Sequence, residues 1–280
     1  MGVRAYTFVT ESRHERTGFL TTGHPVRSIS AYTSITSVPG SRTTLITMNS
    51  YRTARQTMLI DADDTLWHNN IYFEQTTETF IDYLRHSSLG RDEIKQVIME
   101  IEHANLQTKG YGAESYANNL VEAYRRLSER EIDQKQLDDV FNFGMSILDA
   151  DIELLHGVSE TLEELSARHE LVLFTKGNPD EQRSKIERSG IAQHFLHVGI
   201  VPEKDVRAYV EVIATVNAVT DRTWMVGNSP RSDINPALNA GMGAVFIPYD
   251  RTWELEIEEI RATNGRFLQL ERFSELTLHF

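Results

Sequence analysis

The stretch Thr57-Met58-Leu59-Ile60-Asp61-Ala62-Asp63-Asp64-Thr65 decides the fold class. Met58, Leu59 and Ile60 are consecutive large apolar residues, which predicts a short buried strand. An acidic cluster follows at once, where this strand ends. Open α/β sheets bind their ligands at the carboxyl ends of the strands. We therefore expect this segment to contribute to a functional site.

Four helical patterns follow without a convincing strand between them. The weakest comes first and carries Phe73, Phe80 and Leu84. The other three place apolar residues at helical spacing: Ile94, Val97, Ile98 and Ile101; Tyr116, Leu120, Ala123 and Leu127; Leu137, Val140, Phe141, Gly144, Met145 and Leu148. Together they predict an inserted helical bundle over residues 73–149.

Strand and helix patterns alternate after residue 150. Strands are expected at 171–175, 195–201, 224–226 and 244–247, and helices at 158–168, 180–189, 205–218 and 233–240. Such alternation predicts right-handed βαβ units. The fold class is therefore α/β, with a Rossmann-like three-layer core of mostly parallel sheet built from residues 56–72 and 150–280. Asn178 should open the helix at 180–189, and Gly190 should close it.

Composition narrows the classes of function. The 280 residues include no cysteine, so disulfides, thiolate nucleophiles and cysteine-bound metals are excluded. A net charge of -13 disfavours nucleic acid as the main partner, and no apolar run of about 18 residues would span a membrane. We expect a cytoplasmic enzyme whose anion site is built locally.

Residues 1–55 differ from the rest of the chain. They carry seven Arg and two acidic residues, a charge of +5 (7 minus 2), against -18 (21 minus 39) for the remainder. Three interpretations stay open: a transit segment, a misassigned start with Met48 as the true one, or an accessory element with a short strand at Thr44–Met48.

The motif Asp61-Ala62-Asp63-Asp64-Thr65 resembles the D-x-D-x-T signature of the haloacid dehalogenase superfamily. Three further matches follow in the order of that superfamily: Phe174-Thr175-Lys176-Gly177, then Glu203-Lys204, then Gly227-Asn228-Ser229-Pro230-Arg231-Ser232-Asp233. The resemblance covers roughly residues 57–250, and the helical block falls where many members carry a cap. Phosphatase-like members are the most similar. Alternatively, Asp63 or Asp64 only caps a turn that Thr65 ties down.

The resemblance implies a role for each matched residue. Asp61 would attack phosphorus and form an aspartyl-phosphate. Asp63 would act as general acid and base, which requires surroundings that favour its neutral form. Thr175 would donate a hydrogen bond to the phosphoryl group. Lys204 would balance the charge of Asp61, with Lys176 as the alternative.

The implied cofactor is Mg²⁺. Its ligands would be Asp61, the backbone carbonyl of Asp63, Asp233 and Asn228. Asn228 departs from the family, which usually has an acidic residue there, so the metal affinity is in doubt. Asp233 has an alternative role as N-cap of the helix at 233–240.

The expected activity is hydrolysis of a small phosphorylated metabolite. A phosphomutase would use the same residues. A 2-haloacid dehalogenase needs no metal and generally lacks the second aspartate, so Asp63 favours phosphoryl transfer. A non-catalytic binding protein is the alternative from another class. The sequence names neither substrate nor oligomeric state, although Tyr111, between two glycines, is a candidate substrate contact. We expect His68 to be exposed to solvent.

Overall fold

The computed structural model describes residues 54–261 and 265–280. The predictions for residues 1–53, including the short strand at Thr44–Met48, lie outside the described residues.

The core is a six-stranded sheet in which every neighbouring pair is parallel, in the order β3-β2-β1-β4-β5-β6. Its strands are β1 (Thr57–Ile60), β2 (Glu170–Lys176), β3 (His197–Val201), β4 (Thr223–Gly227), β5 (Gly243–Phe246) and β6 (Phe267–Gln269). The predicted α/β fold with a mostly parallel sheet is confirmed.

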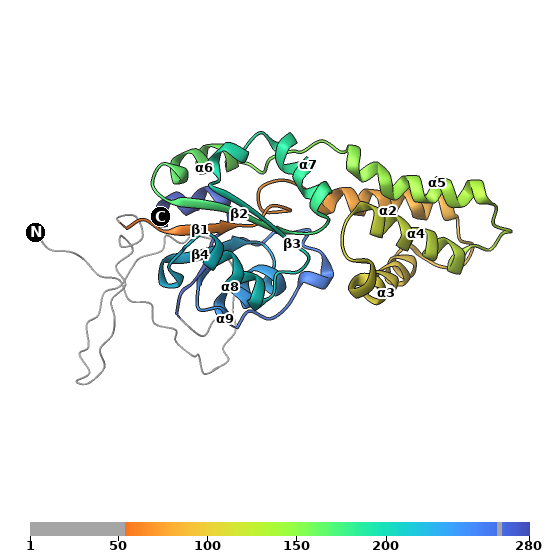
Figure 1. Cartoon of the computed structure of the whole chain (residues 1–280). Coiled ribbons are helices and arrows are strands. Elements are labelled where there is room, and N and C mark those ends of the chain that lie inside the picture. The colour runs from red at the N-terminus through yellow and green to blue at the C-terminus, as the bar shows by residue number, and fades with distance from the viewer. Residues whose placement is uncertain (1–53, 262–264) are drawn as a thin grey trace, which may run out of the picture. The chain divides into compact units, whose positions relative to one another are not determined.

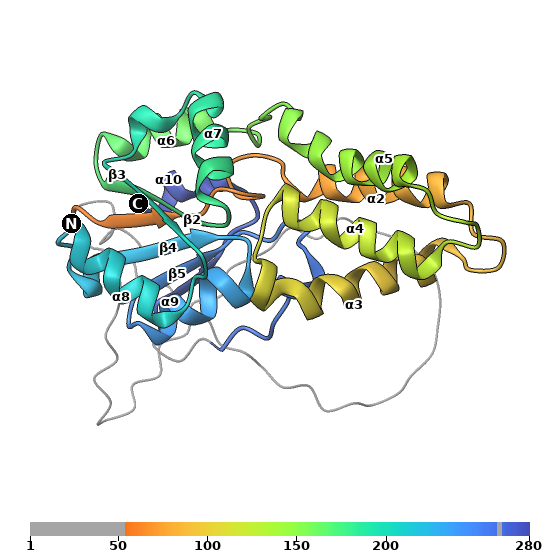
Figure 2. The same ribbon diagram turned by 45° about the vertical axis from the view of Figure 1, so that its right-hand side comes forward.

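Helices cover both faces of this sheet (Figures 1 and 2). The flanking helices are α6 (Val158–Ser166), α7 (Pro179–Ser189), α8 (Val206–Thr215), α9 (Asn235–Asn239) and α10 (Leu276–His279). Met58 and Ile60 of β1 pack into the hydrophobic cluster with α6, α7 and α10, whereas Leu59 packs into the cluster with α8 and α9. Successive strand residues point to opposite faces, so β1 must be apolar throughout.

Two predicted elements differ markedly from the structure, and two short elements were not predicted. The strand expected at 195–201 begins at His197, because residues 192–194 form a 3₁₀ turn. The helix expected at 233–240 is replaced by one π-helical turn, η4 (Pro230–Ile234), followed by α9. The short elements β6 and α10 were not predicted, because they are too short to show a hydrophobic period in the sequence. The predicted caps of α7 are confirmed: Asn178 accepts the N–H groups of Asp180 and Glu181, and Gly190 is left-handed.

Along the chain, four helices come between β1 and the remaining strands of the core. They are α2 (Asn70–Leu84), α3 (Arg91–Lys109), α4 (Ala113–Leu127) and α5 (Gln134–Met145), and a 3₁₀ turn (Ser146–Asp149) follows. Their apolar faces form a separate hydrophobic cluster that includes Phe80, Ile101, Leu120 and Val140. This helical bundle therefore has a core of its own. No helix in the described ranges has the length and apolarity needed to cross a bilayer.

Candidate active site

The carboxyl ends of four neighbouring strands bring the predicted site residues together. Asp61 follows β1, Thr175 lies at the end of β2, Lys204 follows β3, and Asn228 follows β4. Because these strands are parallel and adjacent, their ends meet at one edge of the sheet. Residues separated by more than 160 positions in sequence thus share one site.

Lys204 lies between two carboxylates at the centre of this site. Its Nζ is 2.5 Å from Oδ1 of Asp61 and 2.8 Å from Oδ1 of Asp233. All three residues are buried. Burial raises the pKa of Asp61, and Lys204 only partly opposes this. Burial alone would lower the pKa of Lys204, but Asp233 and Asp61 raise it above its usual value. The ammonium group therefore stays charged between its two partners.

Gly227 and the π-helical turn position Asp233. A Cβ atom at Gly227 would lie 2.2 Å from Oδ2 of Asp233, so only glycine allows this carboxylate so close to the end of β4. The same oxygen accepts the backbone N–H of Ser229 at 3.0 Å. Asp233 lies inside the turn, and the N-cap position of α9 is Ile234. The alternative role of Asp233 as a helix N-cap is therefore wrong.

The loop after Asp61 holds two further polar residues of the first motif. Oγ1 of Thr65 lies 3.0 Å from Oδ2 of Asp61 and 3.2 Å from Oδ1 of Asn228. Asp64 is left-handed (φ 62°), and its carboxylate accepts the N–H groups of Asn69 and Asn70 at the start of α2. Burial raises the pKa of Asp64 to about 7. Asp64 thus caps the bundle's first helix, and Thr65 joins the first and fourth motifs.

The surroundings of Asp63 differ from those expected. Its carboxylate accepts from Nε1 of Trp67 at 2.8 Å, Nε2 of Gln182 at 2.8 Å and Nζ of Lys185 at 3.1 Å. Lys185 in turn donates to Oδ1 of Asn69 at 2.8 Å. All three partners of this carboxylate are donors, and one of them is a cation. The Asp63 side chain points to α7 and not to Lys204.

Lys176 belongs to a second buried cluster beside the first. Its Nζ donates to Glu256 at 2.6 Å, to the hydroxyl of Ser232 at 2.8 Å and to that of Tyr111 at 3.0 Å. The Tyr111 hydroxyl donates to Glu203 at 2.6 Å. Lys204, and not Lys176, is therefore the lysine that contacts Asp61.

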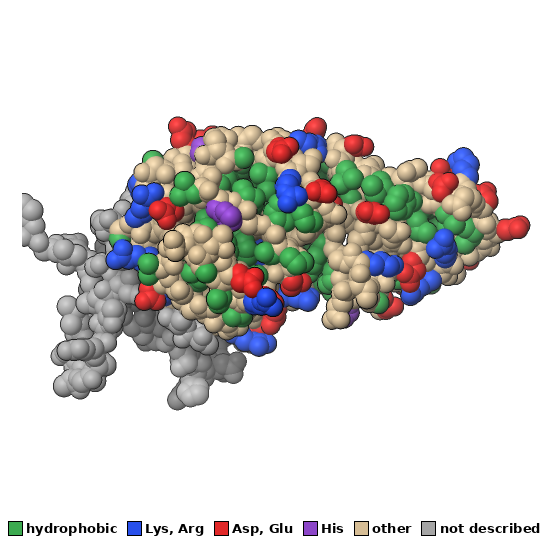
Figure 3. Space-filling model, in the orientation of Figure 1, with side chains coloured by type: hydrophobic (Ala, Val, Ile, Leu, Met, Phe, Trp, Pro, Cys, Tyr) green, Lys and Arg blue, Asp and Glu red, His purple; other side chains and the backbone are tan. Residues whose placement is uncertain are grey.

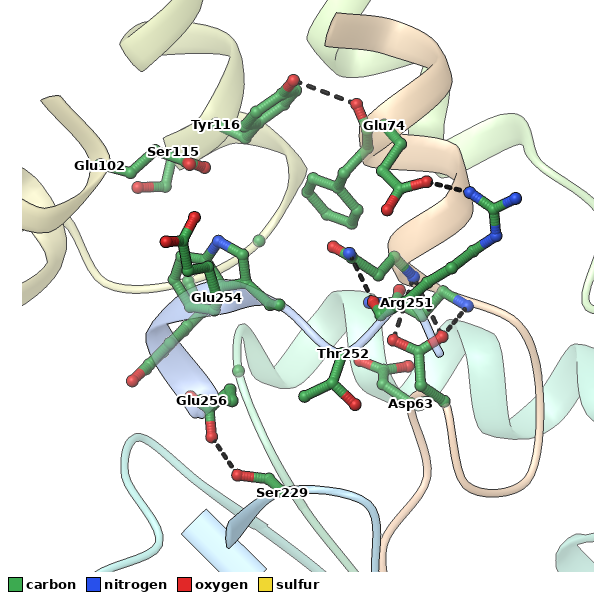
Figure 4. A pocket seen from close by; sticks show the side chains of 18 of the residues that line it. Asp63, Glu74, Glu102, Ser115, Tyr116, Ser229, Arg251, Thr252, Glu254 and Glu256 are labelled. Atoms are coloured by element: carbon green, nitrogen blue, oxygen red, sulfur yellow. Dashed lines mark hydrogen bonds and ion pairs between the residues drawn. The ribbon is translucent and has the colours of Figure 1, made fainter. Parts of the chain in front are cut away.

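A cavity of about 1090 Å³ lies between this site and the helical bundle. Asp61, Thr175 and Lys204 line it on the side of the sheet. Figure 4 shows Glu102, Ser115 and Tyr116 on the side of the bundle, opposite Asp63, Thr252 and Ser229. Tyr111 also lines the cavity, as its position between two glycines suggested.

The donor set fits Mg²⁺. The carboxylates of Asp61 and Asp233, the Asp63 carbonyl and the Asn228 amide supply only oxygen, the ligand type that this ion prefers. The close approach allowed by Gly227 brings Asp233 to the same lysine as Asp61. Two carboxylate side chains meet at this lysine, and no cluster of three or more acidic or histidine side chains forms a metal site within residues 54–261 and 265–280.

Sequence analysis missed Gln182, Lys185 and Glu256. Gln182 and Lys185 are polar residues on the buried face of α7, where apolar ones are usual. Polar residues at such positions could have been recognised in the sequence as candidates for the site. Glu256 had no such signal, because it lies in a single 3₁₀ turn after β5 that is too short to show a pattern. The prediction for His68 was wrong: it is half-buried, and its Nδ1 lies 2.7 Å from the hydroxyl of Tyr249.

A parallel α/β core with a buried Asp–Lys–Asp group at its carboxyl edge defines the class of protein. Residues 56–241 match the family of haloacid dehalogenase-like hydrolases, and the chain belongs to that family. It is therefore a hydrolase of this fold.

Two curated relatives are phosphatases. The chain is 33% identical over 82 residues to a phosphoserine phosphatase from Thermus thermophilus, and 32% identical over 91 residues to a glyceraldehyde 3-phosphate phosphatase from Pyrococcus furiosus. These alignments cover 28% and 31% of this chain and 33% and 38% of the relatives. The chain thus spans little more than a third of the length of either relative.

Solved structures match over a longer span. A haloacid dehalogenase-like family hydrolase from Xanthomonas campestris superposes with a TM-score of 0.70 at 28% identity, covering 81% of this chain and 92% of that one. An L-2-haloacid dehalogenase from Xanthobacter autotrophicus superposes with a TM-score of 0.56 at 15% identity, covering 80% and 97%. The second match shows a shared fold alone.

Proposed function

We propose that the protein is a Mg²⁺-dependent phosphatase that hydrolyses a small phosphorylated metabolite through an aspartyl-phosphate. The observation that carries this proposal is the buried group of Asp61, Lys204 and Asp233 at the base of a cavity large enough for a metabolite. Phosphatase relatives and the second aspartate, Asp63, favour phosphoryl transfer over dehalogenation.

The residues divide the chemistry between two steps. In the first, a carboxylate oxygen of Asp61 attacks phosphorus, and the bond to the leaving oxygen breaks as Asp63 donates a proton to it. In the second, Asp63 takes a proton from water, the water oxygen attacks phosphorus, and the Asp61 carboxylate departs. As general acid, Asp63 would carry that proton at the start of the first step, beside Lys185, from which its side chain accepts in this structure.

Lys204 and Thr175 would stabilise the negative charges of Asp61 and of the phosphoryl group. The ammonium group of Lys204 holds one oxygen of Asp61 and leaves Oδ2 to Thr65 and to the reaction. Thr175, buried at the end of β2, would donate its hydroxyl to a phosphoryl oxygen. When bound by Asp61, Asp233, Asn228 and the Asp63 carbonyl, Mg²⁺ would neutralise part of the phosphoryl charge.

We propose that the helical bundle over residues 73–149 is a cap on this site. It supplies one wall of the cavity, and the hydroxyl of its Tyr111 donates a hydrogen bond to Glu203, next to Lys204. A cap of this kind would exclude water until the phosphoenzyme has formed. Residues 56–72 and 150–280 would then be the catalytic core.

The test is phosphate release from phosphorylated metabolites and an aryl phosphate, with and without Mg²⁺. We expect turnover that requires the metal and that Asp61→Asn lowers by at least about 1,000-fold. Asp180→Asn is the matched control, because it makes the same change at an exposed site on α7.

Other outcomes would point elsewhere. Phosphoryl transfer to an added acceptor without net release would indicate a mutase. Thermal stabilisation by phosphorylated ligands without turnover would indicate a binding protein. Metal-independent halide release from 2-chloropropionate would indicate a dehalogenase, and each of these results overturns the proposal.

A further inference from the structure

Among the residues that the structure describes, every basic side chain that lines the cavity is paired with an acidic one, whereas not every acidic side chain there is paired with a basic one. Its basic side chains each form an ion pair with a carboxylate of this chain: Lys95 with Glu78, Lys176 with Glu256, Lys185 with Asp63, Lys204 with Asp61, and Arg251 with Glu74. None of these cations is available to a second anionic group of a substrate without breaking a pair. The cavity therefore disfavours a leaving group that carries its own negative charge.

Glu102, in contrast to these cations, is an acidic residue of the cavity that lacks an ion-pair partner among the described residues. It lies on α3, on the bundle side of the cavity (Figure 4). The indole of Trp253 only partly offsets the effect of its burial. Burial without a cation raises the pKa of Glu102 to about 7. A carboxyl group in this condition gains most from a cationic ligand, which would restore its ionised form.

Aromatic side chains line the same cavity. Phe73, Tyr116 and Trp253 come from α2, α4 and the segment after β5. Aromatic faces attract cations through the ring quadrupole, and they offer no compensation to an anion. An unpaired carboxyl group and aromatic rings favour the same kind of ligand.

We propose that the leaving group of the substrate carries a positively charged nitrogen that binds to Glu102. The inference rests on the proposed phosphatase function and adds a substrate class to it: phosphate monoesters of amino alcohols or amino sugars. Asp61 would act on the phosphoryl end while Glu102 holds the ammonium end, which makes Glu102 a specificity-determining residue.

A matched series of monoesters tests this proposal. ω-Aminoalkyl, ω-hydroxyalkyl and ω-carboxyalkyl phosphates of two to six carbons differ only in the charge of the far end and in its distance from phosphorus. With Mg²⁺ present, we expect kcat/KM for the amino compound at the best length to exceed that of the hydroxyl compound by at least about tenfold. The carboxyl compound should be the poorest.

Variants separate Glu102 from the general charge of the cavity. Glu102→Gln should lower kcat/KM for amino compounds about tenfold or more and leave that for hydroxyl compounds within about twofold. Glu254→Gln, at an exposed position of the same cavity, should change neither by more than about twofold. Thermal unfolding of both variants checks that they are folded, and Glu102→Asp should restore part of the preference.

The outcomes distinguish the two proposals. If neutral and anionic esters are hydrolysed as well as cationic ones, or if Glu102→Gln keeps the preference, the role of Glu102 is wrong while the phosphatase function stands. If no member of the series is hydrolysed but other phosphate monoesters are, the substrate class is wrong. Loss of all Asp61-dependent phosphate release would overturn the function itself.

Discussion

At the scale of single residues, the site depends on one buried cation between two buried carboxylates. Lys204 is 3% exposed, Asp61 6% and Asp233 1%. Removing charges from water is costly, and the cost is offset only while the three groups remain together. The lysine that balances Asp61, the proposed nucleophile, should therefore also stabilise the fold.

Lys204→Met should show both effects. We expect the free energy of unfolding to fall by about 3 kcal/mol, because two buried carboxylates lose their cation, and phosphate release to fall at least about 100-fold. Chemical denaturation at pH 7 and phosphate assays measure the two effects. Lys109→Met, which breaks a half-exposed pair with Glu122, should cost less than about 1 kcal/mol. Equal costs for the two variants would contradict this account.

Four of the site residues could be predicted because they follow strand ends. Parallel strands place Asp61, Thr175, Lys204 and Asn228 at one edge of the sheet. The partners of Asp63 and Lys176 depend on how α7 and the segment after β5 pack, and no local pattern fixes that packing. Hence Glu256 emerged only from the structure, and the polar residues on the buried face of α7 did not by themselves identify Asp63 as the partner of Lys185.

At the scale of elements, strands and long helices were predictable and irregular turns were not. Apolar runs and helical periodicity located β1, β2, β4 and the long helices of the bundle. The π-helical turn at 230–234 shows no such periodicity in the sequence. It forms where Gly227 allows Asp233 to approach the strand. The elements that sequence analysis missed were too short to show a period.

The contact of α4 with α5 gives a prediction at this scale. A Cβ atom at Gly144 would lie 2.4 Å from Cα of Ala117, so the two helices touch through their backbones there. We expect Gly144→Ala to lower the free energy of unfolding by about 1–3 kcal/mol, because the helices must move apart. Gly90→Ala, whose Cβ atom would meet nothing closer than 3.6 Å, should stay within about 0.5 kcal/mol. Denaturant titrations of both variants decide; an unchanged Gly144→Ala midpoint would mean that the contact is looser.

At the scale of the whole molecule, negative charge dominates the sequence but not the surface drawn in Figure 3. Acidic and basic side chains are interspersed on that face, so opposite charges lie near one another. The net charge of -13 therefore disfavours polyanions in general without making that face a repulsive patch. Stability against pH should then depend on a few buried groups more than on the surface.

His169 is the buried group whose protonation should weaken the fold in acid. Its Nδ1 accepts the backbone N–H of Gln56 at 3.2 Å, which ties the start of β1 to the start of β2. Burial, together with the charges of Arg168 and Arg55, lowers the pKa of His169 from 6.5 to about 4. The unfolded chain therefore binds more protons here between these pH values, so this contribution is complete above pH 6.5 and is lost as the pH falls toward 4. Asp61 and Asp64, whose pKa values are raised, act in the opposite sense, so a comparison with a variant is needed.

His169→Asn keeps an acceptor near Nδ1 but does not titrate. Between pH 6.5 and 4 we expect the wild type to lose about 1–3 kcal/mol more of its free energy of unfolding than this variant does. Denaturant titrations across that range, analysed where unfolding remains two-state, measure the difference. Parallel curves would show that the histidine is not the acid-sensitive group. A steeper curve for the variant would mean that protonated His169 finds a partner in the folded state, because the sign would then be reversed.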